Sequence, residues 1–319
     1  MERMLLVINP ISGTADKRGL AERITATLRQ HGIDCLTAYT RHPGHATTLA
    51  AEAAAQGYDA VLACGGDGTV NETARALCGT KTALGIIPAG SGNGLARHIG
   101  IPIDPLASLR IIARRHVEAC DYGTVNGQPF FCTFGIGFDA AVSDRFAAAP
   151  GRGRLTYIKS AMTELRHYTP QHYVIEADGH RMERDAFIIT GANASQYGNN
   201  AYIAPTASIR DGFLDIVVVS PLSPPAMAMF GIDMMSGTLA HNRHIEVFRC
   251  KHALIERCCD GPAHIDGEPA TLGRTLEVKC HPAALNILTD AGKHPFTPVI
   301  TPLSAFIEGI SLSLHMGRI

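Results

Sequence analysis

The first third of the chain alternates short apolar runs with segments in which apolar residues recur every three to four positions. Residues 4–8 (MLLVI) form such a run, and Leu20, Ile24 and Leu28 then follow at helical spacing before Gly32. The runs predict buried strands, and the spacing predicts an amphipathic helix that a glycine ends. Up to about residue 121 the same reading gives strands at 33–40, 60–63 and 84–87 and helices at 45–56, 69–77 and 105–115. This alternation predicts a parallel sheet with helices on both faces.

Beyond residue 121 the pattern changes to short strand-like runs separated by turn residues such as Asp178-Gly179. Strands are expected at 130–134, 173–177, 187–190, 214–219, 245–248, 253–257, 276–280 and 285–288, and one helix at about 155–167. These short runs predict a second domain that is largely antiparallel β. The methionine-rich segment 227–239 reads as a core helix, with a pocket for a flexible apolar chain as the alternative.

Three polar, glycine-bearing segments directly follow predicted strands: residues 9–13 (NPISG), 65–69 (GGDGT) and 88–93 (PAGSGN). The carboxyl ends of parallel strands meet at one edge of a sheet, where ligands bind in folds of this kind. A glycine-rich turn into a helix start offers unpaired N–H groups and partial positive charge to a phosphate. The convergence of these loops predicts a nucleotide-sized anion site.

The Asp67 carboxylate inside the GGDGT segment would repel a phosphate. Its presence is consistent with a divalent cation between the two groups, or with Asp67 ordering the loop by accepting N–H bonds. The segment does not match the P-loop pattern GxxxxGK[ST], and GSGNG at 90–94 lacks the GxGxxG spacing of dinucleotide-binding folds. A P-loop NTPase is therefore excluded as an interpretation, and a dehydrogenase is disfavoured.

Composition narrows the class of protein further. The chain has 319 residues, 46% apolar and 18% charged, with a formal net charge of −1, which argues against nucleic acid as a partner. No signal peptide and no run long enough for a membrane span is visible, so a cytoplasmic protein without a transmembrane segment is expected. The nine cysteines are odd in number and form no CxxC pair, which predicts reduced thiols. A zinc site in the His- and Cys-rich segment 241–264 is disfavoured, because its spacing matches no ligand pattern.

Two acidic turns lie in the second domain. In residues 211–215 (DGFLD), the Asp211 carboxylate and main-chain oxygens at a bend would suit a hard cation such as Mg²⁺. In residues 266–269 (DGEP), a hairpin end would project Glu268, and Pro269 would stiffen the backbone after it. A carboxylate held in this way can take a proton from an attacking hydroxyl.

Taken together, NPISG, GGDGTVNE and PAGSGNGLA in this order, with the later GFDA (137–140), DGFLD and DGEP, resemble the diacylglycerol kinase catalytic-domain superfamily. That superfamily includes bacterial lipid kinases, sphingosine kinases and ceramide kinases. The resemblance covers about residues 3–290. It implies an α/β plus β fold: a Rossmann-like parallel-sheet ATP-binding domain at 1–121 and an antiparallel β-sandwich-like lipid-binding domain at 122–291. The amphipathic tail 292–319 is expected to pack back on the first domain, with a homodimer contact or a lipid surface as alternatives.

The resemblance also implies roles for single residues. Glu268 would be the catalytic base, and Asp67 would position the nucleotide or its metal. A magnesium site would use the Asp211 carboxylate with main-chain oxygens of Ser208 and Phe213. The ATP-binding residues implied in this way are Asn9, Thr40, Gly65, Gly66, Asp67, Gly68, Thr69, Val70, Asn71, Glu72, Gly90 and Ser91.

The leading hypothesis is an ATP- and Mg²⁺-dependent lipid kinase that acts at a membrane surface on diacylglycerol or a sphingoid base. The acceptor stays open, because PAGS at 88–91 is similar to sphingosine kinases, whereas many bacterial diacylglycerol kinases read PLGT there and GFDA is of the diacylglycerol type. One alternative is a NAD kinase, since those enzymes also carry GGDGT. Another is a non-catalytic nucleotide- or lipid-binding module, against which Glu268, Asp211 and the intact loops argue.

Overall fold

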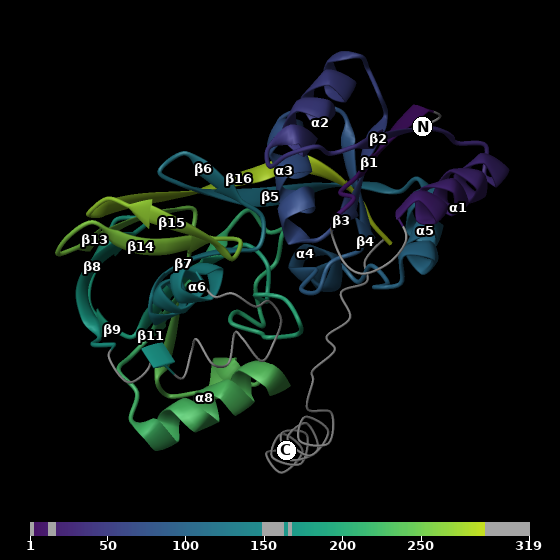
Figure 1. The fold of residues 1–319 in the computed structure, drawn as a ribbon. Helices are drawn as coiled ribbons and strands as arrows, with labels where there is room; N and C mark the ends of the chain where they lie inside the picture. The colour runs from purple at the N-terminus through teal and green to yellow at the C-terminus, as the bar shows by residue number, and fades with distance from the viewer. Residues whose placement is uncertain (1–2, 12–16, 149–162, 165–167, 291–319) are drawn as a thin grey trace, which may run out of the picture.

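The computed structural model describes residues 3–11, 17–148, 163–164 and 168–290 (Figure 1). The tail 292–319, residues 12–13 of the first loop and nearly all of the helix expected at 155–167 lie outside these residues. The N-terminal half begins with four parallel strands in the order β2-β1-β3-β4. These are β1 (Arg3–Ile8), β2 (Asp34–Tyr39), β3 (Ala60–Gly65) and β4 (Ala83–Pro88), each close to its predicted position.

Helices cover both faces of this parallel sheet (Figure 1). Helices α1 (Lys17–Gln30) and α5 (Pro105–Arg114) lie on one face, and α2 (His45–Ala55) and α3 (Asp67–Leu77) lie on the other. The strands serve both layers by alternation, since Leu62 packs with the α1 and α5 residues while Val61 and Ala63 pack with those of α2 and α3. Burial on both faces explains why these strands read as continuous apolar runs.

The sheet does not end at β4. The long strand β16 (Thr275–Leu288) pairs with β4 in parallel and with β13 (His252–Arg257) and β5 (Val117–Val125) antiparallel. The sheet has ten strands in all. The other three are β8 (Gln171–Ala177), β9 (His180–Ala186) and β6 (Gln128–Phe130). The two strands predicted at 276–280 and 285–288 are therefore wrong as separate elements: they are one strand with an irregularity between His281 and Leu285. The predicted boundary after residue 121 falls inside β5.

A second, antiparallel sheet of six strands faces this extension. Its order is β12 (Ile245–Cys250), β11 (Leu214–Val219), β10 (Ile188–Ala192), β7 (Thr133–Gly137), β14 (Gly261–Ile265) and β15 (Glu268–Leu272). The single strand predicted at 130–134 is wrong, because the chain crosses from one sheet to the other between β6 and β7. As a result the rings of Phe130 and Phe134 meet across the core, with centroids 5.4 Å apart. Two sheets around a shared apolar core form the expected sandwich.

The remaining helices lie at the edges of these layers: α4 (Gly94–His98), α6 (Phe138–Ala148), α8 (Pro224–Ser236) and the 3₁₀ turn η1 (Leu239–His241). The methionine-rich α8 is a surface helix rather than the core helix we expected, since it buries Phe230 and Ser236 and leaves Met229 52% exposed. Among the described residues, no helix combines the length and apolarity that crossing a membrane requires. All nine cysteines are free.

Candidate active site

The loops after β1, β3 and β4 lie side by side at the carboxyl edge of the parallel strands. The backbone N–H of Asn9 donates to the carbonyl of Cys64 at 3.1 Å, which joins the first loop to the end of β3. The second and third loops touch through their backbones: a Cβ built on Gly90 would lie 2.4 Å from the Cα of Gly66. Only glycine allows so close an approach. The predicted convergence of these loops is therefore present.

Asp67 ties the second loop to the third. One carboxylate oxygen accepts the N–H of Asn93 at 2.9 Å, and the other accepts the N–H of Gly94 at 2.7 Å. Asn93 stands in the left-handed region (φ 53°) and binds back to Gly90 through both ends of its side-chain amide. Of the two explanations offered for Asp67, the geometry supports loop ordering by accepted N–H bonds.

The start of α3 faces this pair of loops. Gly66 is its N-cap and supplies no side-chain acceptor, so the first amides of the helix remain available to a ligand. Thr69 is buried, with its hydroxyl 2.4 Å from the place where a Cβ on Gly65 would lie. Partly exposed glycines with a helix N-terminus behind them provide the geometry of an anion site.

Other residues implied in ATP binding have protein contacts of their own. Val70 is buried in the core beneath α2 and α3. The Glu72 carboxylate accepts the N–H groups of Gly44 (2.8 Å) and Ala46 (3.1 Å), and thereby caps the start of α2. Asn71 is 3% exposed, and its amide nitrogen has no hydrogen-bond partner among the described residues. The partly exposed residues at the start of α3 are thus Gly66, Asp67 and Gly68, and ATP contacts by the residues after them stay a prediction.

The flanking predicted residues stay close to the same edge. The Asn9 side chain accepts the N–H of Ile11 at 3.1 Å and so shapes the first loop. Thr40 directly follows β2, and its N–H donates to the carbonyl of Ile8 at 2.9 Å. Ser91 is exposed between the two glycines that border Asp67 and Gly66.

Glu268 reaches these loops from the opposite sheet. Strands β14 and β15 form a hairpin whose two turn residues, Asp266 and Gly267, have φ angles of 52° and 81°. This is the conformation that an Asp-Gly hairpin turn favours. One oxygen of Glu268 lies 3.2 Å from the position of a Cβ on Gly68, and the other lies 3.9 Å from the Arg75 guanidinium. The Glu268 side chain is 54% exposed, so it is accessible beside the anion site.

Asp266 anchors the turn that carries Glu268. Its carboxylate accepts the backbone N–H groups of Phe131 (2.9 Å), Cys132 (2.7 Å) and Thr133 (3.0 Å). Burial raises the pKa of Asp266 to about 6, against the opposing effect of these N–H groups. The sequence reading selected DGEP for Glu268 and missed this role of Asp266, although its place in the motif was a signal.

The residues at the predicted magnesium site do not fit a cation as they are arranged. One oxygen of Asp211 accepts the N–H of Phe213 at 3.1 Å, and the other lies 3.4 Å from the Arg249 guanidinium. Arg249 also pairs with the buried Asp215 at 3.2 Å. A guanidinium beside the Asp211 carboxylate repels a divalent cation. The Ser208 hydroxyl accepts the N–H of Arg210, whereas the predicted ligands at Ser208 and Phe213 are main-chain oxygens, whose role stays a prediction. In the described part of the chain, no three His, Cys, Asp or Glu side chains gather as metal ligands.

Asp121, which the sequence analysis missed, is hydrogen-bonded to the turn that contains Asp211. It is 4% exposed and accepts the N–H groups of Gly212 and Ala283, each at 2.7 Å. Nothing in its local sequence marks it, because Ala283 is 162 residues away. Arg75 was also missed. It lies on the same helix as Gly68, but only the folded chain brings Glu268 close to both residues.

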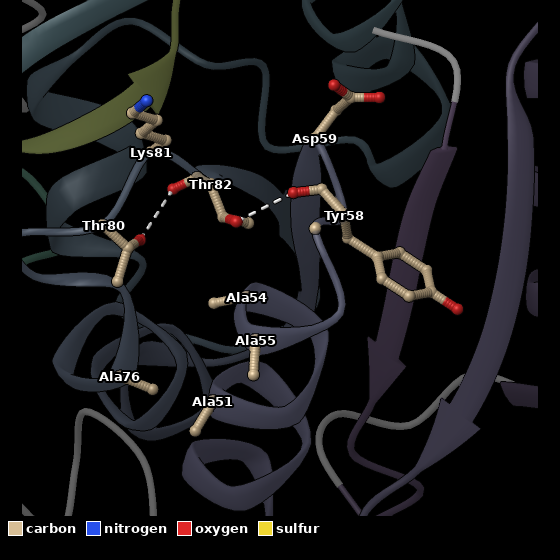
Figure 2. Close-up of a pocket in the computed structure, with 10 residues that line it drawn as sticks. Ala51, Ala54, Ala55, Tyr58, Asp59, Ala76, Thr80, Lys81 and Thr82 are labelled. Atoms are coloured by element: carbon tan, nitrogen blue, oxygen red, sulfur yellow. Dashed lines mark hydrogen bonds between the residues drawn. The ribbon is translucent and has the colours of Figure 1, made fainter.

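A cavity of about 660 Å³ lies at the other edge of the parallel strands (Figure 2). Figure 2 shows Ala51, Ala54, Ala55 and Ala76 lining one side and Thr80, Lys81 and Thr82 the other. The Thr82 hydroxyl donates to the carbonyl of Tyr58 at 2.8 Å. Because this edge carries the amino ends of the strands, none of the glycine-bearing loops reaches it. We therefore do not place the chemistry there.

Comparison with known proteins agrees with this geometry. Residues 3–125 match the family model "Diacylglycerol kinase catalytic domain", and residues 133–289 match "YegS C-terminal NAD kinase beta sandwich-like domain". A diacylglycerol kinase of Mycobacterium tuberculosis is 31% identical over 295 residues, which cover 90% of this chain and 94% of that protein. The chain belongs to the diacylglycerol kinase family.

Two further proteins match nearly the whole length of this chain. A protein of Xanthomonas oryzae pv. oryzae named "Probable lipid kinase YegS-like" is 29% identical over 296 residues, covering 88% of this chain and 94% of that one. A solved structure from Bacillus anthracis str. Sterne matches with a TM-score of 0.77 at 26% identity and covers 92% of this chain and 99% of that chain. The family and the α/β plus β fold inferred from the motifs are thus confirmed. The family consists of lipid kinases, which are transferases that use ATP.

Proposed function

We propose that this protein is an ATP-dependent lipid kinase that transfers the γ-phosphate to the hydroxyl of a membrane lipid, and that diacylglycerol is its acceptor. One observation carries the proposal. Glu268, from the second sheet, lies directly over Gly68 at the start of α3, beside the loops that meet there. A general base and an anion site from different parts of the chain face each other across one gap.

In the proposed reaction the triphosphate binds at the first amides of α3 and at the Gly90 loop, with Asp67 holding the two together. Magnesium that accompanies ATP would offset phosphate charge. Glu268 accepts the proton of the lipid hydroxyl as that oxygen bonds to the γ-phosphorus and the bond from the γ-phosphorus to the oxygen it shares with the β-phosphate breaks. The products are ADP and the lipid phosphate, and Glu268 returns its proton to water.

Arg75 and the names of the relatives favour diacylglycerol over a sphingoid base. The guanidinium lies 3.9 Å from Glu268 and therefore next to the place of the reacting hydroxyl. A sphingoid base carries an ammonium on the carbon next to the one that bears that hydroxyl, and the Arg75 guanidinium would repel it. Diacylglycerol is neutral there. The relative from M. tuberculosis is named a diacylglycerol kinase.

The protein would meet its acceptor as a cytoplasmic protein that associates with the membrane surface during turnover. A phosphorylation screen tests the proposal, with diacylglycerol, sphinganine, ceramide and a prenyl alcohol in mixed micelles, and with NAD in solution. We expect labelled phosphate on diacylglycerol. Glu268→Gln should lower turnover at least about 10²-fold with ATP affinity retained, because it removes the base and leaves the loops in place. Near-normal turnover of this variant would remove Glu268 from its role.

Two results of the screen would replace the proposal. Phosphorylation of NAD without lipid turnover would identify a NAD kinase, which uses the same glycine-rich loop for a polar acceptor. ATP binding without turnover of any acceptor would identify a non-catalytic nucleotide-binding module. Sphinganine phosphorylated faster than diacylglycerol would overturn the argument from Arg75.

A further inference from the structure

A buried polar cluster lies behind the turn that carries Glu268, and the proposed reaction does not use it. His264 of β14 is 2% exposed, and Asp139 of α6 is 5% exposed. The His264 Nε2 atom lies 3.0 Å from one Asp139 oxygen, to which the Tyr197 hydroxyl also donates at 2.8 Å. Thr190 bonds to the Tyr197 hydroxyl at 2.6 Å. Burial of several ionisable groups is costly unless they are hydrogen-bonded, and a buried network with its bonds satisfied is rigid.

The contacts of His264 determine where its ring proton lies. The backbone N–H of Gly267 points to the Nδ1 atom of His264 at 3.4 Å. An Nδ1 that faces a donor must be an acceptor, so the ring carries its proton on Nε2 and donates to Asp139. A chain of hydrogen bonds thus runs from Asp139 through the imidazole to the backbone beside Glu268.

The pair is fitted closely against β7. A Cβ built on Gly135 would lie 2.3 Å from the Asp139 carboxylate and 2.4 Å from His264 Nε2. Gly135 pairs with His264 across the strands, and its missing side chain provides the space that the imidazole and the carboxylate occupy. The ring thus lies buried behind the hairpin turn.

The turn is held by the cross-strand pair of Ile265 and Glu268 and by the Asp266 N–H, which donates to the carbonyl of Thr133 at 2.7 Å. Two side chains add to this backbone support. Asp266 fixes its first residue to the link between β6 and β7 through the N–H groups of Phe131, Cys132 and Thr133. Gly267, which has no side chain of its own, is in contact only through its backbone, and the His264 bond is its hydrogen bond to a side chain. Without that bond the backbone of Gly267 is freer to rotate between these supports, and its rotation changes the direction of the adjacent Glu268.

We propose that His264, oriented by Asp139, is a positioning residue that sets the direction of Glu268 through the backbone of Gly267. The inference rests on the proposed function of Glu268 as the base. A displacement of about 1 Å at a reacting group can lower the rate about 10²-fold. His264 acts on the acceptor side, so ATP binding at the loops around Asp67 is independent of it.

A matched pair of variants tests this role. His264→Asn keeps an acceptor near the place of Nδ1 and loses the donor to Asp139, whereas His264→Gln keeps a donor toward Asp139 and loses the acceptor for Gly267. We expect His264→Gln to lower kcat about 10²-fold with the KM for ATP within about twofold, and His264→Asn to retain more kcat. Tyr197→Phe is the control, because it removes another bond to the same Asp139 oxygen without touching the turn.

A double-mutant cycle separates positioning from general stability. If His264 acts through Glu268, the loss caused by His264→Gln shrinks to about twofold or less in the Glu268→Gln background. Losses that multiply, or kcat retained in His264→Gln, would overturn the inference. Hydrogen exchange gives a readout without turnover: the Gly267 amide should exchange faster in His264→Gln than in Tyr197→Phe, and equal rates would sink the proposal. Wild-type protein that phosphorylates no lipid would instead contradict the proposed function, and hydrogen exchange would still decide the role of His264.

Discussion

Asp67→Asn is the most informative single substitution, because it changes the contact that joins two glycine loops and leaves the volume of the side chain unchanged. Both carboxylate oxygens accept a backbone N–H, from Asn93 at 2.9 Å and from Gly94 at 2.7 Å. An amide can accept only one of them and turns an NH₂ group toward the other. Loss of a hydrogen bond to a charged group, or an unsatisfied donor in its place, costs about 1.5–3 kcal/mol.

An opposing effect must be subtracted. The substitution removes a negative charge from an anion site, and relief of repulsion from a nearby phosphate favours ATP by ~1 kcal/mol near water. The loss of loop order outweighs this gain, so we expect a net loss of about 1 kcal/mol, or roughly fivefold in Kd. In the absence of ATP the same lost bonds should lower the Tm by about 4 °C.

Isothermal titration with ATP and a thermal melt of the apo protein measure the two effects. Asp59→Asn is the matched control: Asp59 accepts the N–H of Arg3 at 3.0 Å at the opposite edge of β3, so ATP affinity should not change. ATP affinity that is unchanged or tighter in Asp67→Asn, with no shift in Tm, would refute the loop-ordering role of Asp67.

Three further perturbations follow from the same contacts. Gly90→Ala should lower turnover more than about tenfold, since its methyl would lie 2.4 Å from the Cα of Gly66, and Gly231→Ala, with open space around it, is the control in the same kinetic assay. Burial raises the pKa of Asp266 from 3.8 to about 6, so its contribution to stability is complete below pH 4 and is lost as the pH rises through 6. Urea unfolding at pH 4 to 7 should show a fall on the order of 3 kcal/mol that Asp266→Asn lacks, and equal slopes would contradict this. EDTA should leave the Tm of the nucleotide-free protein within about 1 °C, because Arg249 already pairs with the Asp211 carboxylate of the 208–213 turn. Arg249→Met should lower the Tm, whereas a rise in Tm with magnesium would show that a cation binds at this turn.

The local pattern of the sequence determined the order of elements in the first domain. Apolar runs and helical spacing place β1 to β4 and their helices within a few residues, because strands buried on both faces must be apolar throughout and helices between layers must be amphipathic. Glycines in the loops were informative for a similar reason. The close approach of Gly66 and Gly90 tolerates no side chain, and the turn before Glu268 needs the left-handed backbone of Asp266 and Gly267.

Contacts between distant residues were decided by the tertiary structure alone. The partners of Asp67 lie 26 and 27 residues away, and those of Asp266 lie 133 to 135 residues away. Three other features also depend on which strands pair and in what register. They are the joining of two predicted strands into β16, the division of the strand predicted at 130–134 into β6 and β7, and the capping of α2 by Glu72. An alternating pattern states which face of a strand is buried but not what lies against it. For this reason the sequence indicated Glu268 as the candidate base, whereas only the folded chain showed the His264–Asp139 pair behind its turn.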